Sequence, residues 1–375
     1  MLTPLCGTLD GSTWGDAMGF MGQFRQMGRW IGRPILTRTT KRAARHGPRT
    51  LVVTLDGTMS SLEPGDETSI GLIWKLLTEE GSPSDIVTYY EPGIQYSSWR
   101  QLRDVIEGKG INQQIRRTYG WLASRYRPGD RIYLFGYSRG AYAVRSLAGL
   151  IDDVGLLRRD VATDRNVVQA YRHYRMQSDA ELRAVFRRLH CHEAVPIEMI
   201  GAFDTVKALG MRGPLLGPRN TMETDFHNHG VGGSVRRAYH ALALQERRVA
   251  YDPILWCPDR DWDGICEQVW FRGSHGDVGG HLSGSIGSRP LANIPLVWML
   301  DRAERSGLIL PAGWRARFGC DVDAPSCGMN QGFGKLLLAR KPRVVGMEPS
   351  ERLHVTAAHA GGPGYDMGIE PNLIA

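Results

Sequence analysis

Several features that would assign this chain to a familiar class at once are missing from its sequence. No stretch of about 18 uncharged apolar residues occurs, which argues against a membrane-spanning helix. The start of the chain also lacks the apolar block and small-residue cleavage site of a signal peptide. We therefore expect synthesis in the cytoplasm, with non-classical export or a membrane-peripheral location as the alternatives. A Walker A loop, a dinucleotide fingerprint and an internal repeat are absent too, and we expect no cofactor.

Cysteine is sparse, and no two cysteines form a Cys-x-x-Cys pair. In a chain of this size, six such cysteines are expected to be reduced and mostly buried. An oxidising compartment would leave Cys257–Cys266 or Cys320–Cys327 bridged. Two His-rich tracts, at 190–192 and 225–229, lack the helical spacing that makes metal sites recognisable, so we expect no metal.

The positive charge of the chain is concentrated at its start. Residues 1–50 contain eight Arg and Lys against two Asp, and so carry +6 of the net charge of +7. The rest of the chain is nearly neutral, which is not typical of a nucleic-acid-binding surface, and we expect no nucleic-acid partner. We interpret residues 1–48 as a basic arm and residues 49–375 as the main domain.

Part of this arm has the pattern of an amphipathic helix. Phe20, Phe24, Met27 and Ile31 recur at helical spacing with arginines between them, so residues 17–33 are a candidate for peripheral contact with an anionic membrane. Glycines interrupt the same segment, and each weakens a helix by roughly 1 kcal/mol relative to alanine. They favour the alternative, a mobile arm or a helix packed on the body.

From residue 50 onward, short apolar runs alternate with amphipathic stretches. Strands are expected at Thr50–Leu55, Ile86–Tyr90, Arg131–Phe135, Val195–Phe203 and Glu267–Arg272. Helices are expected at 111–126, Ala141–Ile151, Val235–Arg248 and Leu291–Ala303. Such alternation predicts an α/β fold with a mainly parallel sheet and helices on both faces. The intervening stretches 152–194 and 207–262 are interpreted as insertions that could form a lid.

Three polar residues follow predicted strands in the order Ser138, Asp204, His275. The carboxyl ends of parallel strands meet at one crevice, so these side chains are expected to converge. A serine hydroxyl needs a base to accept its proton before it attacks, and His275 would be that base. Asp204 would hold the imidazole in the correct tautomer and stabilise its charged form. The order serine, acid, histidine is the one found in α/β hydrolases.

The turn Gly136-Tyr137-Ser138-Arg139-Gly140 has the sequence of a nucleophile elbow. Gly136 and Gly140 would remove clashes at a sharp strand-to-helix turn. The backbone N–H of Arg139, at the start of the helix, is a candidate oxyanion donor. A second donor would come from Gly57 or Thr58, after the first strand.

Asp204 and the residues around this turn also fit other roles. Asp204 is also a favoured type of helix N-cap, and Asp277 is an alternative partner for the imidazole. Asp56 would support the oxyanion loop or hold an ion. Leu55-Asp56-Gly57-Thr58 superficially matches the phosphatase motif D-x-D-G-T, but Thr54 stands where that motif has its nucleophilic Asp.

Longer motifs resemble one family, the uncharacterised α/β-hydrolase domains that include the phospholipase effectors of type VI secretion. The resemblance rests on LDGT (55–58), FGYSRGAYAVRSLAGLI (135–151), FDTVKALG (203–210), YHALALQERR (239–248), WFRGSHGDVGG (270–280), LANIPLVWML (291–300) and the tail GYDMGIEPNLIA. It implies esterase or phospholipase chemistry by Ser138, Asp204 and His275. The chain differs from the family pattern at Lys207, Gly276 (usually Ser) and His281.

The leading hypothesis is therefore a serine hydrolase that cleaves an acyl ester through an acyl-enzyme at Ser138. A lipid or phospholipid is the expected substrate. The alternative is a binding or toxin-associated module that retains a vestigial hydrolase core. The sequence does not indicate an oligomeric state.

Overall fold

The computed structural model describes residues 36–39, 47–79, 85–93, 109–206, 230–329, 339–358 and 373–374. Residues 17–33 lie outside this range, so their contact with a membrane stays a prediction. In the part of the chain that is described, no helix is both long and apolar enough to cross a bilayer.

The described strands form one nine-stranded sheet in the order β1-β3-β2-β4-β5-β6-β7-β8-β9. All neighbouring pairs are parallel except the edge pair β1–β3. The strands are β1 (Leu36–Thr39), β2 (Thr50–Leu55), β3 (Ile86–Glu91), β4 (Arg131–Tyr137), β5 (Ile197–Phe203), β6 (Arg237–Ala243), β7 (Ile265–Phe271), β8 (Glu351–His354) and β9 (Leu373–Ile374). The central strands are buried along nearly their whole length, as parallel strands covered on both faces must be.

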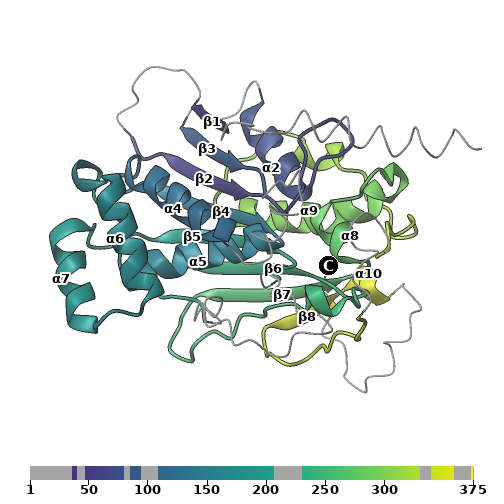
Figure 1. Cartoon of the computed structure of the whole chain (residues 1–375). Coiled ribbons are helices and arrows are strands. Elements are labelled where there is room, and N and C mark those ends of the chain that lie inside the picture. Colours follow the sequence, from purple (N-terminus) through teal and green to yellow (C-terminus); the bar gives the residue numbers. More distant parts are fainter. Residues whose placement is uncertain are drawn as a thin grey trace, which may run out of the picture.

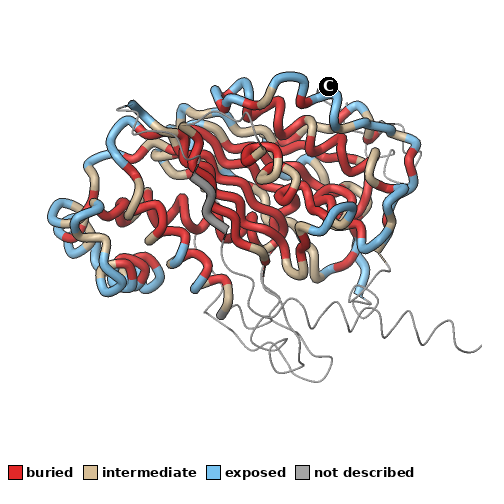
Figure 2. Tube along the Cα trace, turned by 90° about the horizontal axis from the view of Figure 1, so that it is seen from above, coloured by how far each residue is buried: buried red, intermediate tan, exposed pale blue. Residues whose placement is uncertain are grey.

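Helices cover both faces of this sheet (Figure 1). One apolar core joins the sheet to α4, α5, α6 and α7, and a second joins it to α2, α8 and α9. The helices are α2 (Ser69–Thr78), α4 (Lys109–Ala123), α5 (Arg139–Asp153), α6 (Asp164–Arg175), α7 (Ala180–His190), α8 (His275–Gly279), α9 (Arg289–Arg305) and α10 (Val355–Ala358). Short 3-10 turns are η1 (Arg159–Val161), η2 (Val249–Tyr251), η3 (Ile286–Ser288) and η4 (Trp314–Arg317). From above, the buried strands run through the middle of the molecule and exposed segments lie at its periphery (Figure 2). The predicted α/β architecture is thus confirmed.

The helix predicted over Val235–Arg248 is wrong. Its middle is β6, which pairs with β5 on one side and β7 on the other. Ala238, Ala241 and Leu242 are good helix formers, but all three are fully buried between two strands. A fully buried strand shows no alternation of polar and apolar residues, so the pattern could not reveal it.

The first of the two segments interpreted as a lid packs on other helices instead. Within residues 152–194, α6 and α7 pack on the outer side of α4 and α5. Tyr171 donates to Asn112 on α4 (2.9 Å), and Arg187 donates to the carbonyl of Asp152 at the end of α5 (2.9 Å). Figure 1 shows both helices on the side of the molecule away from α8. Their buried apolar residues explain this docking, which leaves them as an added helical layer.

Five cysteines fall in the described residues, and all five are free thiols. Cys191 and Cys327 are buried as predicted, whereas Cys257 and Cys320 are exposed. Among the same residues, no group of three His, Cys, Asp or Glu side chains is arranged to hold a metal ion.

Candidate active site

Ser138 stands between the end of β4 and the first residue of α5. Its backbone has φ 57° and ψ −119°, a conformation that costs an L-residue of order 1–3 kcal/mol. The Ser138 N–H donates to the Phe203 carbonyl at the end of β5 (2.9 Å), and the Tyr142 N–H donates to the Ser138 carbonyl (3.2 Å). These two hydrogen bonds fix the backbone of Ser138, and the Ser138 hydroxyl lies at the carboxyl end of the sheet.

The two glycines of this turn are required by space. A Cβ at Gly136 would collide with the backbone of Gly140. A Cβ at Gly140 would collide with the carbonyl of Leu55 at the end of β2. Both obstacles are main chain and cannot move aside, which agrees with the role predicted for these glycines.

Gly140→Ala is expected to destabilise the fold by about 3 kcal/mol, because the added methyl group overpacks a backbone contact. Urea unfolding monitored by circular dichroism measures this loss. Gly120→Ala in α4 is the matched control, since its Cβ would meet Val167 at an ordinary 3.5 Å. That change should be neutral or stabilise by up to about 1 kcal/mol. Equal effects of the two substitutions would contradict the steric explanation.

His275 lies between the serine and the acid. Its Nε2 is 3.0 Å from the Ser138 Oγ, and its Nδ1 is 2.5 Å from the Asp204 Oδ2. Ser138 is 7% exposed, His275 6% and Asp204 0%. The three residues come from the ends of β4, β5 and β7, so the predicted convergence at the carboxyl edge is what the structure has. His275 begins the short helix α8 rather than lying in an irregular glycine loop.

Asp204 is held as an anion by its neighbours. The Arg343 guanidinium donates Nη1–H to Oδ1 (2.6 Å) and Nη2–H to Oδ2 (2.9 Å), and the Ala243 N–H donates to Oδ1 (3.0 Å). Burial by itself would raise the pKa of this carboxyl, but the charge of Arg343 and the hydrogen bond to His275 outweigh it and hold the pKa well below its usual range. The Asp204 carboxylate therefore serves His275 and Arg343 and does not cap a described helix.

Aromatic rings enclose the imidazole of His275. The Tyr251 ring stacks on it with centroids 4.5 Å apart, and the Tyr137 ring lies 4.9 Å away on a tilted plane. Tyr251 belongs to η2, inside the second predicted insertion, 207–262. The described part of this insertion thus reaches the site, whereas residues 207–229 lie outside the described residues.

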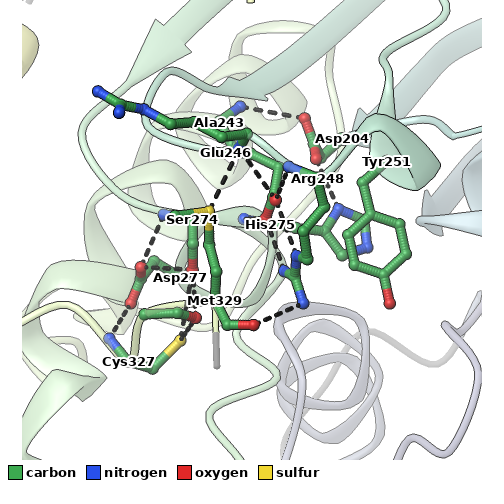
Figure 3. Close-up of polar contacts among 12 residues, drawn as sticks. Asp204, Ala243, Glu246, Arg248, Tyr251, Ser274, His275, Asp277, Cys327 and Met329 are labelled. Carbon is green, nitrogen blue, oxygen red and sulfur yellow. Dashed lines mark hydrogen bonds and ion pairs between the residues drawn. The ribbon is translucent and has the colours of Figure 1, made fainter. Parts of the chain in front are cut away.

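A buried ion pair supports the loop behind His275 (Figure 3). The Glu246 carboxylate accepts from the backbone N–H of His275 (3.1 Å) and from Nη2 of Arg248 (2.6 Å). The Arg248 guanidinium in turn lies over the Tyr251 ring, 4.3 Å from its centroid. The Glu246–Arg248 pair thus connects the start of α8, which contains His275, to η2, which contains the stacked Tyr251.

Asp277 points away from the imidazole. Its carboxylate accepts from the Ser274 N–H (2.7 Å) and the Cys327 N–H (2.8 Å) (Figure 3). It also accepts from the Ser326 hydroxyl (2.5 Å). It caps α8 and ties a later loop to it. Gly276 fits this packing, because a Cβ there would lie 2.9 Å from the Cys327 Sγ.

Asp56 shapes the loop on the other side of Ser138. It is 1% exposed and accepts from the hydroxyls of Thr68 (2.7 Å) and Tyr90 (2.9 Å) and from the Gly57 N–H (2.7 Å). Burial raises its pKa to about 6, although these hydrogen bonds act in the opposite direction. Because the Gly57 N–H is engaged by Asp56, Gly57 is not the free donor that was predicted. The Thr58 N–H is left as the candidate from this loop.

Sequence reasoning missed Arg343, Glu246 and Tyr251 as site residues. Arg343 is 139 residues from Asp204 and lies in no recognisable motif. Glu246 and Arg248 belong to the QERR motif. The sequence predicted this motif to be the end of a helix, and that prediction does not bring either side chain to His275. Only the tertiary fold brings these side chains to the site.

Comparisons with known proteins match most of this chain to one family. Residues 49–302 match the family model described as the catalytic domain of the Tle1-like phospholipase effectors of type VI secretion. An uncharacterized protein of Saccharomyces cerevisiae, YEL023C, is 29% identical over 236 residues, which cover 56% of this chain and 33% of the yeast protein. The chain thus spans about a third of that relative.

Two solved structures are similar at low identity. One is an uncharacterized protein from Pseudomonas aeruginosa, with 17% identity and a TM-score of 0.39, covering 73% of this chain and 49% of that one. The other is the Tle1 effector bound to the VgrG spike from the Type 6 secretion system, with 15% identity and a TM-score of 0.32, covering 66% of this chain and 57% of that one.

Proposed function

The chain belongs to the family of Tle1-like phospholipase effectors of type VI secretion, matching the model of their catalytic domain, and from this premise we propose that it hydrolyses an acyl ester of a phospholipid through Ser138. Membership supports a lipase-type hydrolase. The observation that carries the finer proposal is the continuous hydrogen-bonded line from the Ser138 Oγ through His275 to Asp204.

In the acylation step, the Ser138 Oγ forms a bond to the ester carbonyl carbon while His275 Nε2 takes the hydroxyl proton. The tetrahedral intermediate then collapses, the carbon–oxygen bond to the leaving alcohol breaks, and the imidazolium returns the proton to that alcohol. A water molecule attacks the acyl-enzyme by the same route, releasing the fatty acid and restoring the serine. Asp204, kept ionised by Arg343, stabilises the imidazolium in both steps.

Negative charge on the carbonyl oxygen needs hydrogen-bond donors. The Arg139 N–H at the start of α5 is favourably placed, since the amino end of a 15-residue helix carries partial positive charge. The Thr58 N–H is the proposed second donor. The Thr58 hydroxyl is buried and has no partner among the described residues, so it offers a further donor at the same place.

The test is hydrolysis of phosphatidylglycerol vesicles by the full chain, with products measured by mass spectrometry. Acyl-ester cleavage yields fatty acid and lysophospholipid in equal amounts, whereas cleavage at the phosphate yields phosphatidic acid or diacylglycerol. Ser138→Ala is the blank. If neither vesicles nor short nitrophenyl esters are cleaved by wild type beyond that blank, the vestigial binding module becomes the better account.

A further inference from the structure

We propose that Arg343 is a positioning residue of the reaction, which fixes the Asp204 carboxylate so that it can serve His275. The inference rests on the proposed function of the Ser138 site and extends it to a segment beyond residues 49–302, where the family model matches. Arg343 lies 41 residues after the end of that match.

The contact geometry is that of a clamp. Two parallel N–H donors of Arg343 bind the two oxygens of Asp204, an arrangement that sets the plane of the carboxylate as well as its place. The same guanidinium donates to the carbonyl of Ala243 at the end of β6 (2.8 Å) and to the carbonyl of Tyr251. Arg343 therefore joins the acid to the residue that stacks on the imidazole.

The clamp holds a conformation that the backbone does not favour. Asp204 has φ 43°, in the left-handed region that L-residues seldom adopt, and its side chain is fully buried. A carboxylate in this position would tend to take up a proton or turn toward another donor. With Arg343 in place, Oδ2 remains charged and directed at His275 Nδ1.

A purely structural role explains the arrangement less well. The Arg343 side chain is 2% exposed, and its Nε is buried without a partner in the described part of the chain. Buried ion pairs are poor stabilisers, because desolvation offsets their attraction. An arginine with an unsatisfied nitrogen is a costly way to stabilise a fold, whereas it is well suited to orienting one carboxylate.

The charge of Arg343 also has a consequence for pH dependence. Arg343 Nη2 and His275 Nδ1 bind the same oxygen, Oδ2, so the charge of Arg343 acts directly on the carboxylate that serves the imidazole. Loss of that charge raises the pKa of the Asp204 carboxyl, which then takes up a proton at a higher pH, so activity should be lost at a higher pH on the acidic side. The other titratable or charged groups around the imidazole are Glu246, Arg248, Tyr251, Tyr137 and His281.

The experiment compares Arg343→Met and Arg343→Lys in the full chain, using nitrophenyl butyrate hydrolysis across pH. For Arg343→Met, kcat should fall about a hundredfold with little change in KM, because misplacement of a catalytic group by 1 Å costs about that much. Its acidic limb should move up by about one pH unit. Arg343→Lys keeps the charge but loses the two-point contact, so kcat should fall about tenfold with the acidic limb unchanged.

Arg302→Met is the matched control. Arg302 is similarly buried and pairs with Glu267 and Asp301, but it lies in the last turn of α9, and Glu267 is near the amino end of β7, away from the serine. That variant should lower Tm and leave kcat and the acidic limb as in wild type. If Arg343→Met behaves in the same way, the positioning role is refuted.

Two further outcomes are distinguishable. If wild-type protein takes up no fluorophosphonate at its serine, the proposed function fails, and this inference fails with it. If wild type is active but Arg343→Met does not fold, Arg343→Lys decides. A wild-type kcat for Arg343→Lys would overturn the proposal while the hydrolase function stands.

Discussion

Ser138→Ala is expected to lower kcat for ester hydrolysis by about 10⁶-fold and to abolish labelling by a fluorophosphonate probe. The hydroxyl is the group that would bond to the carbonyl carbon, and among the described residues it is the one hydroxyl that contacts His275 Nε2. Binding and the oxyanion donors remain, so KM should change little. Steady-state kinetics measure the loss of kcat, and mass spectrometry of the modified peptide measures the loss of labelling. Undiminished labelling of the variant would refute Ser138 as the nucleophile.

A second substitution at the same position separates chemistry from backbone strain. Ser138→Gly removes the same hydroxyl, but glycine adopts φ 57° and ψ −119° without a steric penalty. It should therefore be as inactive as Ser138→Ala and yet have a free energy of unfolding about 1 kcal/mol higher. Equal stabilities would show that the turn is not strained, although the assignment of the nucleophile would be untouched.

The part of the site that could be predicted is the part encoded locally. The run at 131–140 contains both a buried strand and its glycines, because the elbow is built within ten residues. The convergence of Ser138, Asp204 and His275 followed from one topological rule, that parallel strands end at a common edge. Each of the three residues could be recognised from the predicted strand that precedes it.

What could not be predicted depends on contacts between distant segments. Arg343 reaches Asp204 across 139 residues, and nothing in its neighbours marks it. The engagement of the Gly57 N–H follows from the rotamer of Asp56, which Thr68 and Tyr90 determine. Strand β6 was mistaken for a helix because burial on both faces removes the alternation that identifies a strand.

Asp204→Asn should lower kcat by about 10⁴-fold, since an amide cannot hold the imidazole in the tautomer that accepts the serine proton. The local geometry sharpens this expectation. The Arg343 guanidinium and the Ala243 N–H both donate to this side chain, so an asparagine must present its oxygen to them and its NH₂ group to His275. His275 Nδ1 would then become the acceptor and Nε2 the donor, the reverse of what catalysis requires. Steady-state kinetics at the pH optimum measure the loss.

Asp277→Asn tests the competing assignment with the same chemical change two residues from the histidine. Among the described residues, its carboxylate accepts from Ser274, the N-cap of α8, and from the loop at 326–327, so the substitution should lower the free energy of unfolding by about 1–3 kcal/mol. Because His275 Nδ1 keeps its bond to Asp204, kcat of the folded protein should stay within about tenfold of wild type. A severe loss in Asp277→Asn with a mild one in Asp204→Asn would mean that the acid is Asp277. The expected difference in kcat between the two variants is much larger than a modest rearrangement of α8 would cause. The tautomer of His275 affects every turnover, whereas loss of the α8 cap changes only the fraction of molecules that are folded.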